Sequence, residues 1–249
     1  MKKTFKNSMI IVFLCIISNL NGQNKTSSII YKKKIVTRLE KSKINNTDAK
    51  KILQNSIIAA KELEYELIFN NYESFFSEIE KLDSDNSNML SNRLARLMGF
   101  GVGKFYMNIE KNKILVQRNL SSDLFLIESE IESQKWKKTN ETKQIGKYTC
   151  FKATTTVLVE TVSAGTVERE VIAWFTPEIP IGFGPAGFGG LPGLIMEIEK
   201  DNAVLYAYKV YLNKEDKGIK MPKRGIKVSK KEFREIQKKG SAYYRQYKN

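Results

Sequence analysis

Apolar and polar residues alternate along much of the chain, and this pattern constrains the fold more than any other feature. The stretches 63–69, 149–159, 171–175 and 194–198 each carry an apolar or small residue at every second position. Successive side chains of a β-strand point to opposite faces of a sheet, so the pattern predicts strands with one buried face. Half-exposed strands of this kind are typical of antiparallel sheets. We therefore expect a predominantly antiparallel sheet.

Two further stretches extend this prediction. Ile114 and Val116 begin another alternating strand. Residues 204–212 alternate after Asp201 and Asn202, and these two residue types favour tight turns. The segment 204–212 is therefore predicted to form a hairpin with the strand before the turn.

Helices are predicted in three places. The first covers 48–60 with Thr47 as its N-cap, and the second covers 88–98 and ends at Gly99. The third lies at the C-terminus, where Ser229 and Glu232 have the spacing of a capping box.

The C-terminal helix is predicted to be amphipathic. Val228 and Phe233 fit a hydrophobic staple at its start. Its apolar stripe is Phe233, Ile236, Gly240, Tyr243, Tyr244 and Tyr247. We expect this stripe to dock onto the sheet rather than onto a partner. A few helices beside an antiparallel sheet give an α+β fold, and residues 23–249 are predicted to form one such domain with a basic tail over 213–249.

Residues 1–22 resemble an export signal. Lys2, Lys3 and Lys6 precede an uncharged apolar run over 9–17, and Gly22 offers a small residue for cleavage. The run is shorter than the roughly 20 residues that span a bilayer, and a buried core helix is the weaker alternative. A lipid anchor at Cys15 is disfavoured by the large Leu14 before it. The mature protein is therefore expected in the periplasm, at the outer membrane or outside the cell.

The chain has no histidine, and this excludes several chemistries. Ser-His-Asp and Cys-His nucleophiles, the HExxH zinc site and zinc fingers all need that residue. After removal of residues 1–22 a single cysteine remains, Cys150, which we expect to be buried and inert. No DxDxDG calcium loop occurs either. We expect no cofactor and no metal.

Positive charge is concentrated near the C-terminus. The chain carries a net charge of +15, and residues 209–249 hold 14 basic but only four acidic side chains. A solvated helix face is one explanation, and contact with an anionic membrane surface is the other. The residues predicted for such contact are Lys220, Lys223, Arg224, Lys227, Lys230 and Lys231. Nucleic-acid binding is not expected, because export and the absence of a recognisable motif disfavour it.

Glycine and proline gather in one apolar segment. Four of the five prolines fall within 177–192, and six of the 15 glycines fall within 182–193. Apolar side chains interleave them, which is unusual for a loop in water. The segment is either a packed crossover between strands or the wall of a binding site. The candidate binding residues are Trp174, Phe175, Pro177, Ile181, Phe183, Pro185, Phe188, Leu191 and Pro192.

The hexapeptide Gly190-Leu191-Pro192-Gly193-Leu194-Ile195 within this segment resembles the name-giving motif of the GLPGLI family. The Trp174-to-Glu178 stretch and the basic tail are also similar. The resemblance covers residues 23–249 and is strongest over 147–212. It implies an exported protein of Gram-negative bacteria, often linked with TonB-type uptake systems, and implies no activity and no functional residues.

The same segment is similar, more distantly, to periplasmic lipoprotein carriers. The similarity lies in a strand that ends in an aromatic residue and proline and leads through a Gly-Leu-Pro turn into the next strand. Those carriers fold as a curved antiparallel half-barrel around an apolar cavity, so the similarity implies a curved sheet.

Three functions remain open at this point. The first is a non-enzymatic binding or carrier protein of the cell envelope, with an apolar ligand or an envelope component. The second is an interaction partner of a TonB-linked outer-membrane complex, which would expose an apolar patch. The third is a carboxylate-dependent hydrolase built on Glu178, Glu197 and Glu199, although these carboxylates fit a solvated strand face better.

Overall fold

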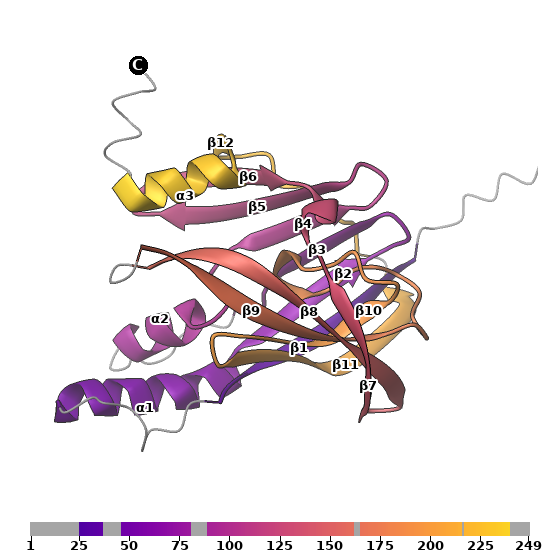
Figure 1. Ribbon diagram of the computed structural model, residues 1–249, viewed down its shortest axis with the longest axis horizontal. Helices are drawn as coiled ribbons and strands as arrows, with labels where there is room; N and C mark the ends of the chain where they lie inside the picture. The colour runs from indigo at the N-terminus through magenta and orange to yellow at the C-terminus, as the bar shows by residue number, and fades with distance from the viewer. Residues whose placement is uncertain (1–24, 37–45, 81–88, 162–164, 216, 240–249) are drawn as a thin grey trace, which may run out of the picture.

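The protein was analysed as a computed structural model that describes residues 25–36, 46–80, 89–161, 165–215 and 217–239 (Figure 1). The predicted signal peptide and the last three tyrosines of the C-terminal stripe lie outside these ranges. None of the helices described is long and apolar enough to cross a membrane.

Twelve strands and three α-helices make up the described part of the chain. The strands are β1 (Thr26–Ile35), β2 (Glu64–Phe69), β3 (Glu73–Glu78), β4 (Lys104–Asn108), β5 (Lys113–Leu120), β6 (Asp123–Ser129), β7 (Lys137–Ile145), β8 (Tyr148–Thr161), β9 (Gly165–Thr176), β10 (Leu194–Lys200), β11 (Ala203–Glu215) and β12 (Ile226–Ser229). The helices are α1 (Thr47–Glu62), α2 (Met89–Leu97) and α3 (Lys230–Lys239), and two short 3₁₀ turns are η3 (Ile131–Ser133) and η4 (Pro185–Gly187).

All twelve strands belong to one open sheet in the order β12-β6-β5-β4-β3-β2-β1-β11-β10-β9-β8-β7. Neighbouring strands are antiparallel except for β12 and β6, which pair in parallel. The prediction of a mostly antiparallel α+β fold is therefore confirmed. The predicted hairpin is β10 and β11, and its turn residues Asp201 and Asn202 both have positive φ.

The sheet bends so that strands far apart in its order face one another. β5 is third and β8 eleventh in that order, yet side chains of both line one cavity. Helix α3 packs on β6 and also contacts β8. Figure 1 shows the β8–β9 ribbon crossing in front of the strands at the middle of the sheet. The bend encloses an inner face on which the main core lies.

The Gly-Pro segment fills this inner face. Ile179, Phe183 and Leu191 are all buried, and the Phe183 ring lies 6.2 Å from that of Phe69 on β2. The backbone N–H of Ile195 donates to the carbonyl of Phe183 at 2.9 Å, which ties the segment to β10. The segment is thus a packed crossover between β9 and β10.

Helix α3 begins as the sequence predicts. Ser229 N–H donates to a carboxylate oxygen of Glu232 at 2.7 Å, and Glu232 N–H donates to the Ser229 hydroxyl at 3.1 Å. These two bonds form the reciprocal capping box. Val228 and Phe233 belong to one buried cluster with Ile236, as expected of a hydrophobic staple.

Two local predictions are wrong. The N-cap of α1 is Asn46 rather than Thr47, because the Asn46 side chain accepts the N–H of Ala49 at 3.0 Å. On β8 the predicted buried face changes phase: Cys150 and Ala153 are fully buried, whereas Phe151 is only half-buried. The pairing of β7 with β8 has a register shift beside these residues, and such an irregularity interrupts strict alternation.

Candidate ligand-binding cavity

A cavity of about 230 Å³ lies between α3 and the inner face of the bent sheet. Its walls come from β5, β6, the end of the β8 strand, η4 with Phe188, and α3. Ligand sites for drug-sized molecules are larger, about 300–1,000 Å³, so this cavity suits a small molecule or one end of a larger one.

Strand β5 supplies one wall through every second residue. Ile114, Val116 and Arg118 share a strand face and all three line the cavity. Ile127 on β6 lies beside them, opposite Val116. The wall formed by β5 is therefore apolar at Ile114 and Val116 and positively charged at Arg118.

The second wall is the Gly-Pro segment, which two side chains hold in place. The Gln134 side-chain amide donates to the carbonyl of Gly187 at 2.7 Å, and the Trp136 indole donates to the carbonyl of Gly189 at 2.8 Å. The Phe188 ring lies 6.3 Å from both the Phe100 and the Trp136 rings, edge to face. These contacts fix Phe188 against the cavity without burying it fully.

Helix α3 forms the roof. Phe233 is buried and its ring packs edge to face on Phe125 of β6, with centroids 5.3 Å apart. Lys230 and Arg234 flank Phe233 on the same helix, and both also line the cavity. Phe233 thus anchors the helix, and Lys230 and Arg234 of the same helix line the cavity.

The Arg118 guanidinium is the most unusual group in the cavity. It lies 5.7 Å from the centre of the Phe105 ring, a cation–π distance. Its Nε is buried and has no hydrogen-bond partner among the described residues. Burial lowers the pKa of Arg118 from its ordinary value.

Lys200 and Lys230 add two more cations. Burial lowers the pKa of Lys200, although its ammonium lies 3.3 Å from the Asp201 carboxylate. Lys230 is exposed as a residue, but desolvation of its ammonium, followed by repulsion from Arg234, Arg118 and Lys200, lowers its pKa as well. The positive groups are therefore close enough to repel one another.

One carboxylate faces these cations. Glu160 on β8 has a side chain that is only 7% exposed, and its Oε1 lies 3.7 Å from the Lys238 ammonium. The same oxygen accepts the Thr166 hydroxyl at 2.8 Å. Oε2 of Glu160 is buried and finds no partner in the described chain.

The predicted binding residues of the Gly-Pro segment fall into three groups. Phe188 lines the cavity. Most of the others are part of the core or are half-buried beside it; these are Trp174, Phe175, Ile181, Phe183, Pro185 and Leu191. Pro177 and Pro192 are exposed. The structure thus brings one of the nine residues to the cavity.

The six basic residues predicted for membrane contact are all exposed. They lie on the connection from β11 to β12, on β12 and on the first turn of α3. Lys230 differs from the rest because it also lines the cavity.

The three carboxylates considered for hydrolysis do not line the cavity. Glu197 lies 2.7 Å from the Lys143 ammonium, and Glu178 accepts the backbone N–H of Thr149 at 2.8 Å. Cys150 is buried as expected, and burial is the main cause that raises the pKa of its thiol to about 11.

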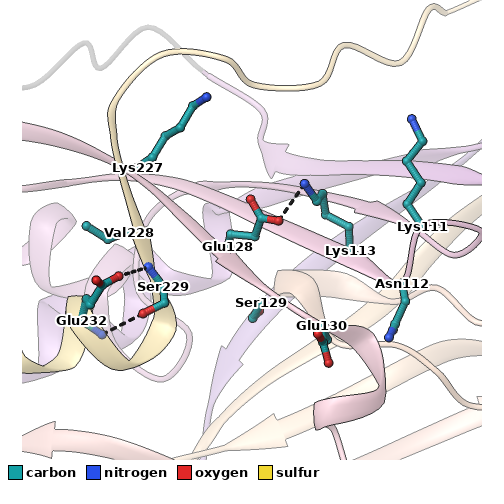
Figure 2. A pocket seen from close by; sticks show the side chains of 10 residues that line it. All are labelled: Lys111, Asn112, Lys113, Glu128, Ser129, Glu130, Lys227, Val228, Ser229 and Glu232. Carbon is teal, nitrogen blue, oxygen red and sulfur yellow. Dashed lines mark hydrogen bonds and ion pairs between the residues drawn. The ribbon is translucent and has the colours of Figure 1, made fainter.

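A second hollow of about 510 Å³ lies beside the start of α3 (Figure 2). Three of its charged side chains have partners within the protein: Lys113 and Glu128 approach to 2.7 Å, and Glu232 is engaged by the capping box. Figure 2 shows Lys111 and Lys227 extending away from the hollow. The cavity under α3 is the better candidate, since Nε of Arg118 is buried there without a hydrogen-bond partner among the described residues.

Comparison with known proteins gives one family match. The matching model is described as a protein of unknown function (Porph_ging), and it aligns with residues 136–171 and 162–197. Together these ranges cover about a quarter of the chain, and the second contains the 190–195 hexapeptide. No curated protein matches the chain.

Two solved structures of PNGF-II match most of this chain. The structure in space group C2 is 18% identical with a TM-score of 0.48, and the structure in P2₁ is 16% identical with a TM-score of 0.47. Each match covers 85% of this chain, and 32% and 33% of the respective PNGF-II chains. The chain thus spans about a third of the length of the structures that it resembles.

Of the four cationic residues of the cavity, only Lys230 was singled out from the sequence, and for membrane contact; Arg118, Lys200 and Arg234 were not predicted. Arg118 continues the inward series of Ile114 and Val116, and Lys200 continues that of Met196 and Ile198. A charged residue at the next inward position of an apolar strand face is the signal that could have found both. Lys230 and Arg234 gave no comparable signal, because cations beside an apolar helix stripe are common on solvated helices.

Proposed function

We propose that the protein is a non-enzymatic binding or carrier protein of the cell envelope that holds an apolar group in the cavity under α3. The observation that carries this proposal is the cavity itself, where Val116, Phe188 and Phe233 converge from β5, the Gly-Pro segment and α3. A concave pocket with mostly apolar walls and few polar groups is the usual form of a small-molecule site.

One sequence feature and one structural feature support the envelope location and the carrier role. The N-terminal 22 residues have the pattern of a signal peptide. The bend of the sheet is compatible with the curved half-barrel that the sequence resemblance implies. The Gly-Pro segment forms one wall of the cavity through Ala186, Gly187 and Phe188, although most of its apolar residues are core.

The test is calorimetric titration of the purified protein with 1-octanol, a neutral apolar probe of suitable size. Transfer of about six methylene groups predicts a dissociation constant of about 0.1–1 mM. Val116→Phe fills the cavity and should weaken binding at least about tenfold. Val36→Phe, at an exposed position, is the matched control and should bind as the parent does. Absence of octanol binding, or equal binding by both variants, would refute the proposal.

A second candidate, docking to an outer-membrane complex, has its own observation. α1 and α2 pack on each other at one end of the molecule (Figure 1) and carry the exposed apolar residues Ile58, Met89, Leu90 and Leu97. Exposed apolar surface is typical of interaction sites. Met89→Lys with Leu90→Lys should abolish capture of a membrane partner from solubilised envelopes, and capture that is unchanged by both substitutions would exclude this surface.

A further inference from the structure

The cationic groups of the cavity outnumber the acidic one. Arg118, Lys200, Lys230 and Arg234 line it, against Glu160 alone. Two of these five groups have partners: Lys200 has Asp201 at 3.3 Å, and Glu160 has Lys238 at 3.7 Å. The remaining three cations have no carboxylate within ion-pair distance in the described part of the chain.

In the absence of a ligand, this arrangement of charges destabilises the folded protein. Like charges close together repel, and a buried guanidinium nitrogen without an acceptor loses hydration with no hydrogen bond in return. The cost is already present before any ligand arrives, because Arg118 is held between Phe105 and the backbone of Gly101 and Gly103. An anion that entered would supply the missing acceptor and reduce the repulsion.

The cations lie beside the apolar walls rather than on a separate surface. Arg118 follows Val116 on one face of β5, and Lys230 and Arg234 flank Phe233 on α3. A molecule in the cavity would therefore meet apolar groups at one end and positive charge at the other. The volume of about 230 Å³ admits a small molecule, whereas a whole phospholipid would not fit.

We infer, on the basis of the proposed binding function, that the cavity recognises a small amphipathic monoanion. Its apolar part lies between Val116, Phe188 and Phe233, and its anionic group contacts Arg118 with Lys200 and Lys230 at the cavity mouth. Glu160, which Lys238 holds, sets a limit of one negative charge on the ligand, because a second would face this carboxylate.

The experiment compares octanoate with 1-octanol on the same protein. A charge-assisted contact in a desolvated site predicts that octanoate binds about 10- to 100-fold more tightly than octanol. Arg118→Met should remove most of this difference, and the readout is the ratio of the octanoate and octanol affinities, because both probes meet the same altered wall. Lys200→Met should act in the same direction, and Lys209→Met, at an exposed position on β11, is the charge-matched control that should change nothing.

Thermal unfolding of the ligand-free variants separates recognition from a structural role. Arg118→Met should unfold at the same or a higher temperature than the parent, because it removes a buried charge that lacks a carboxylate partner. Equal binding of octanoate and octanol, or a marked loss of thermal stability in Arg118→Met, would overturn the inference while the proposed binding function stands. Failure of both probes to bind would instead overturn the proposed function.

Discussion

Among single residues, a cation follows apolar residues on the inward faces of three strands. Ile29 and Tyr31 on β1 lead to Lys33, as Val116 leads to Arg118 and Ile198 leads to Lys200. Lys33 is 1% exposed, and its ammonium donates to the carbonyls of Ala95 at 2.7 Å and Arg96 at 3.2 Å. These carbonyls belong to the C-terminal turn of α2, where positive charge is favourable.

Burial nevertheless lowers the pKa of Lys33 to about 8, and Glu78 opposes this only in part. The unfolded chain keeps an ordinary lysine pKa of about 10.4, so above pH 8 the unfolded state binds more protons than the folded state. Stability contributed by Lys33 therefore rises with pH through its folded pKa. We predict a gain of about 1 kcal/mol in the free energy of unfolding between pH 8 and 9 for the parent, relative to Lys33→Met, measured by urea unfolding.

Three other buried groups also make the stability of the fold depend on pH. Burial raises the pKa values of Cys150 to about 11 and of Tyr31 and Tyr65 above their ordinary values, so these acids stay protonated in the fold and oppose the trend at higher pH. The comparison with Lys33→Met cancels their effect. A constant difference between the two proteins from pH 7 to 9 would contradict the account.

Gly193 allows a close approach of two backbone segments. A Cβ atom there would lie 2.2 Å from the carbonyl oxygen of Thr176, at the point where the Gly-Pro segment returns to the sheet. Gly193→Ala should therefore lower the free energy of unfolding by about 1–3 kcal/mol or more. Gly218→Ala, whose Cβ would meet nothing within 4 Å, is the control. Equal chemical denaturation curves for the two variants would be inconsistent with this packing.

Some features of single residues could be predicted from the sequence, and others could not. The capping box of α3 was predictable, because it depends on side chains three residues apart. The burial of Cys150 was also predictable from its strand-like surroundings. The place of Phe188 in the cavity was not, because it depends on Gln134 and Trp136, which hold neighbouring glycines from more than 50 residues away.

At the scale of elements, α3 is the part on which the cavity most depends. Its attachment depends on Phe233 and Ile236, which pack on β6 and β12 in a small cluster separate from the main core. Local unfolding of such a peripheral element costs less than global unfolding.

We predict that Phe233→Ala detaches α3 without unfolding the sheet. Loss of a buried phenylalanine costs about 3–5 kcal/mol, more than a short terminal helix is expected to withstand. Hydrogen exchange of the α3 amides should become fast while that of β1 and β11 is unchanged, and octanol binding should be lost. Lys231→Ala, at an exposed position on the same helix, is the control. Slow exchange of α3 in Phe233→Ala would show that the helix is held by other contacts.

Element types were more predictable than element partners. Alternation identified β2 and β10 as strands with one buried face. On β11 it identified the strand but not the core face, because Leu205 is buried whereas Tyr208 and Leu212 of the alternating series are exposed. The parallel pairing of β12 with β6 had no local signal, because it joins residues about 100 positions apart. That pairing places α3 over the inner face, so the cavity itself could not be predicted.

In the molecule as a whole, most of the basic side chains of the C-terminal part lie apart from the cavity. Basic side chains that the sequence placed in the tail are exposed along the β11–β12 connection and β12, whereas the cavity holds a smaller inward set. Membrane contact by the exposed set remains a prediction.

For that contact, we expect the quadruple change of Lys220, Lys223, Arg224 and Lys227 to Gln to weaken binding to phosphatidylglycerol vesicles. Each basic residue near an anionic surface contributes about 1 kcal/mol, and the effect should fall with added salt. The matched control changes four exposed lysines elsewhere, Lys50, Lys51, Lys137 and Lys138. Equal vesicle sedimentation of the two quadruple variants would exclude a localised surface.

If a ligand occupies the cavity under α3, a bound probe should be found there. We propose a crystal structure of the protein with 8-bromooctanoate, in which anomalous scattering locates the bromine. We expect a bromine peak between Val116, Phe188 and Phe233, with the carboxylate towards Arg118. A probe that binds in solution but lies elsewhere in the crystal, with this cavity unoccupied, would contradict this expectation.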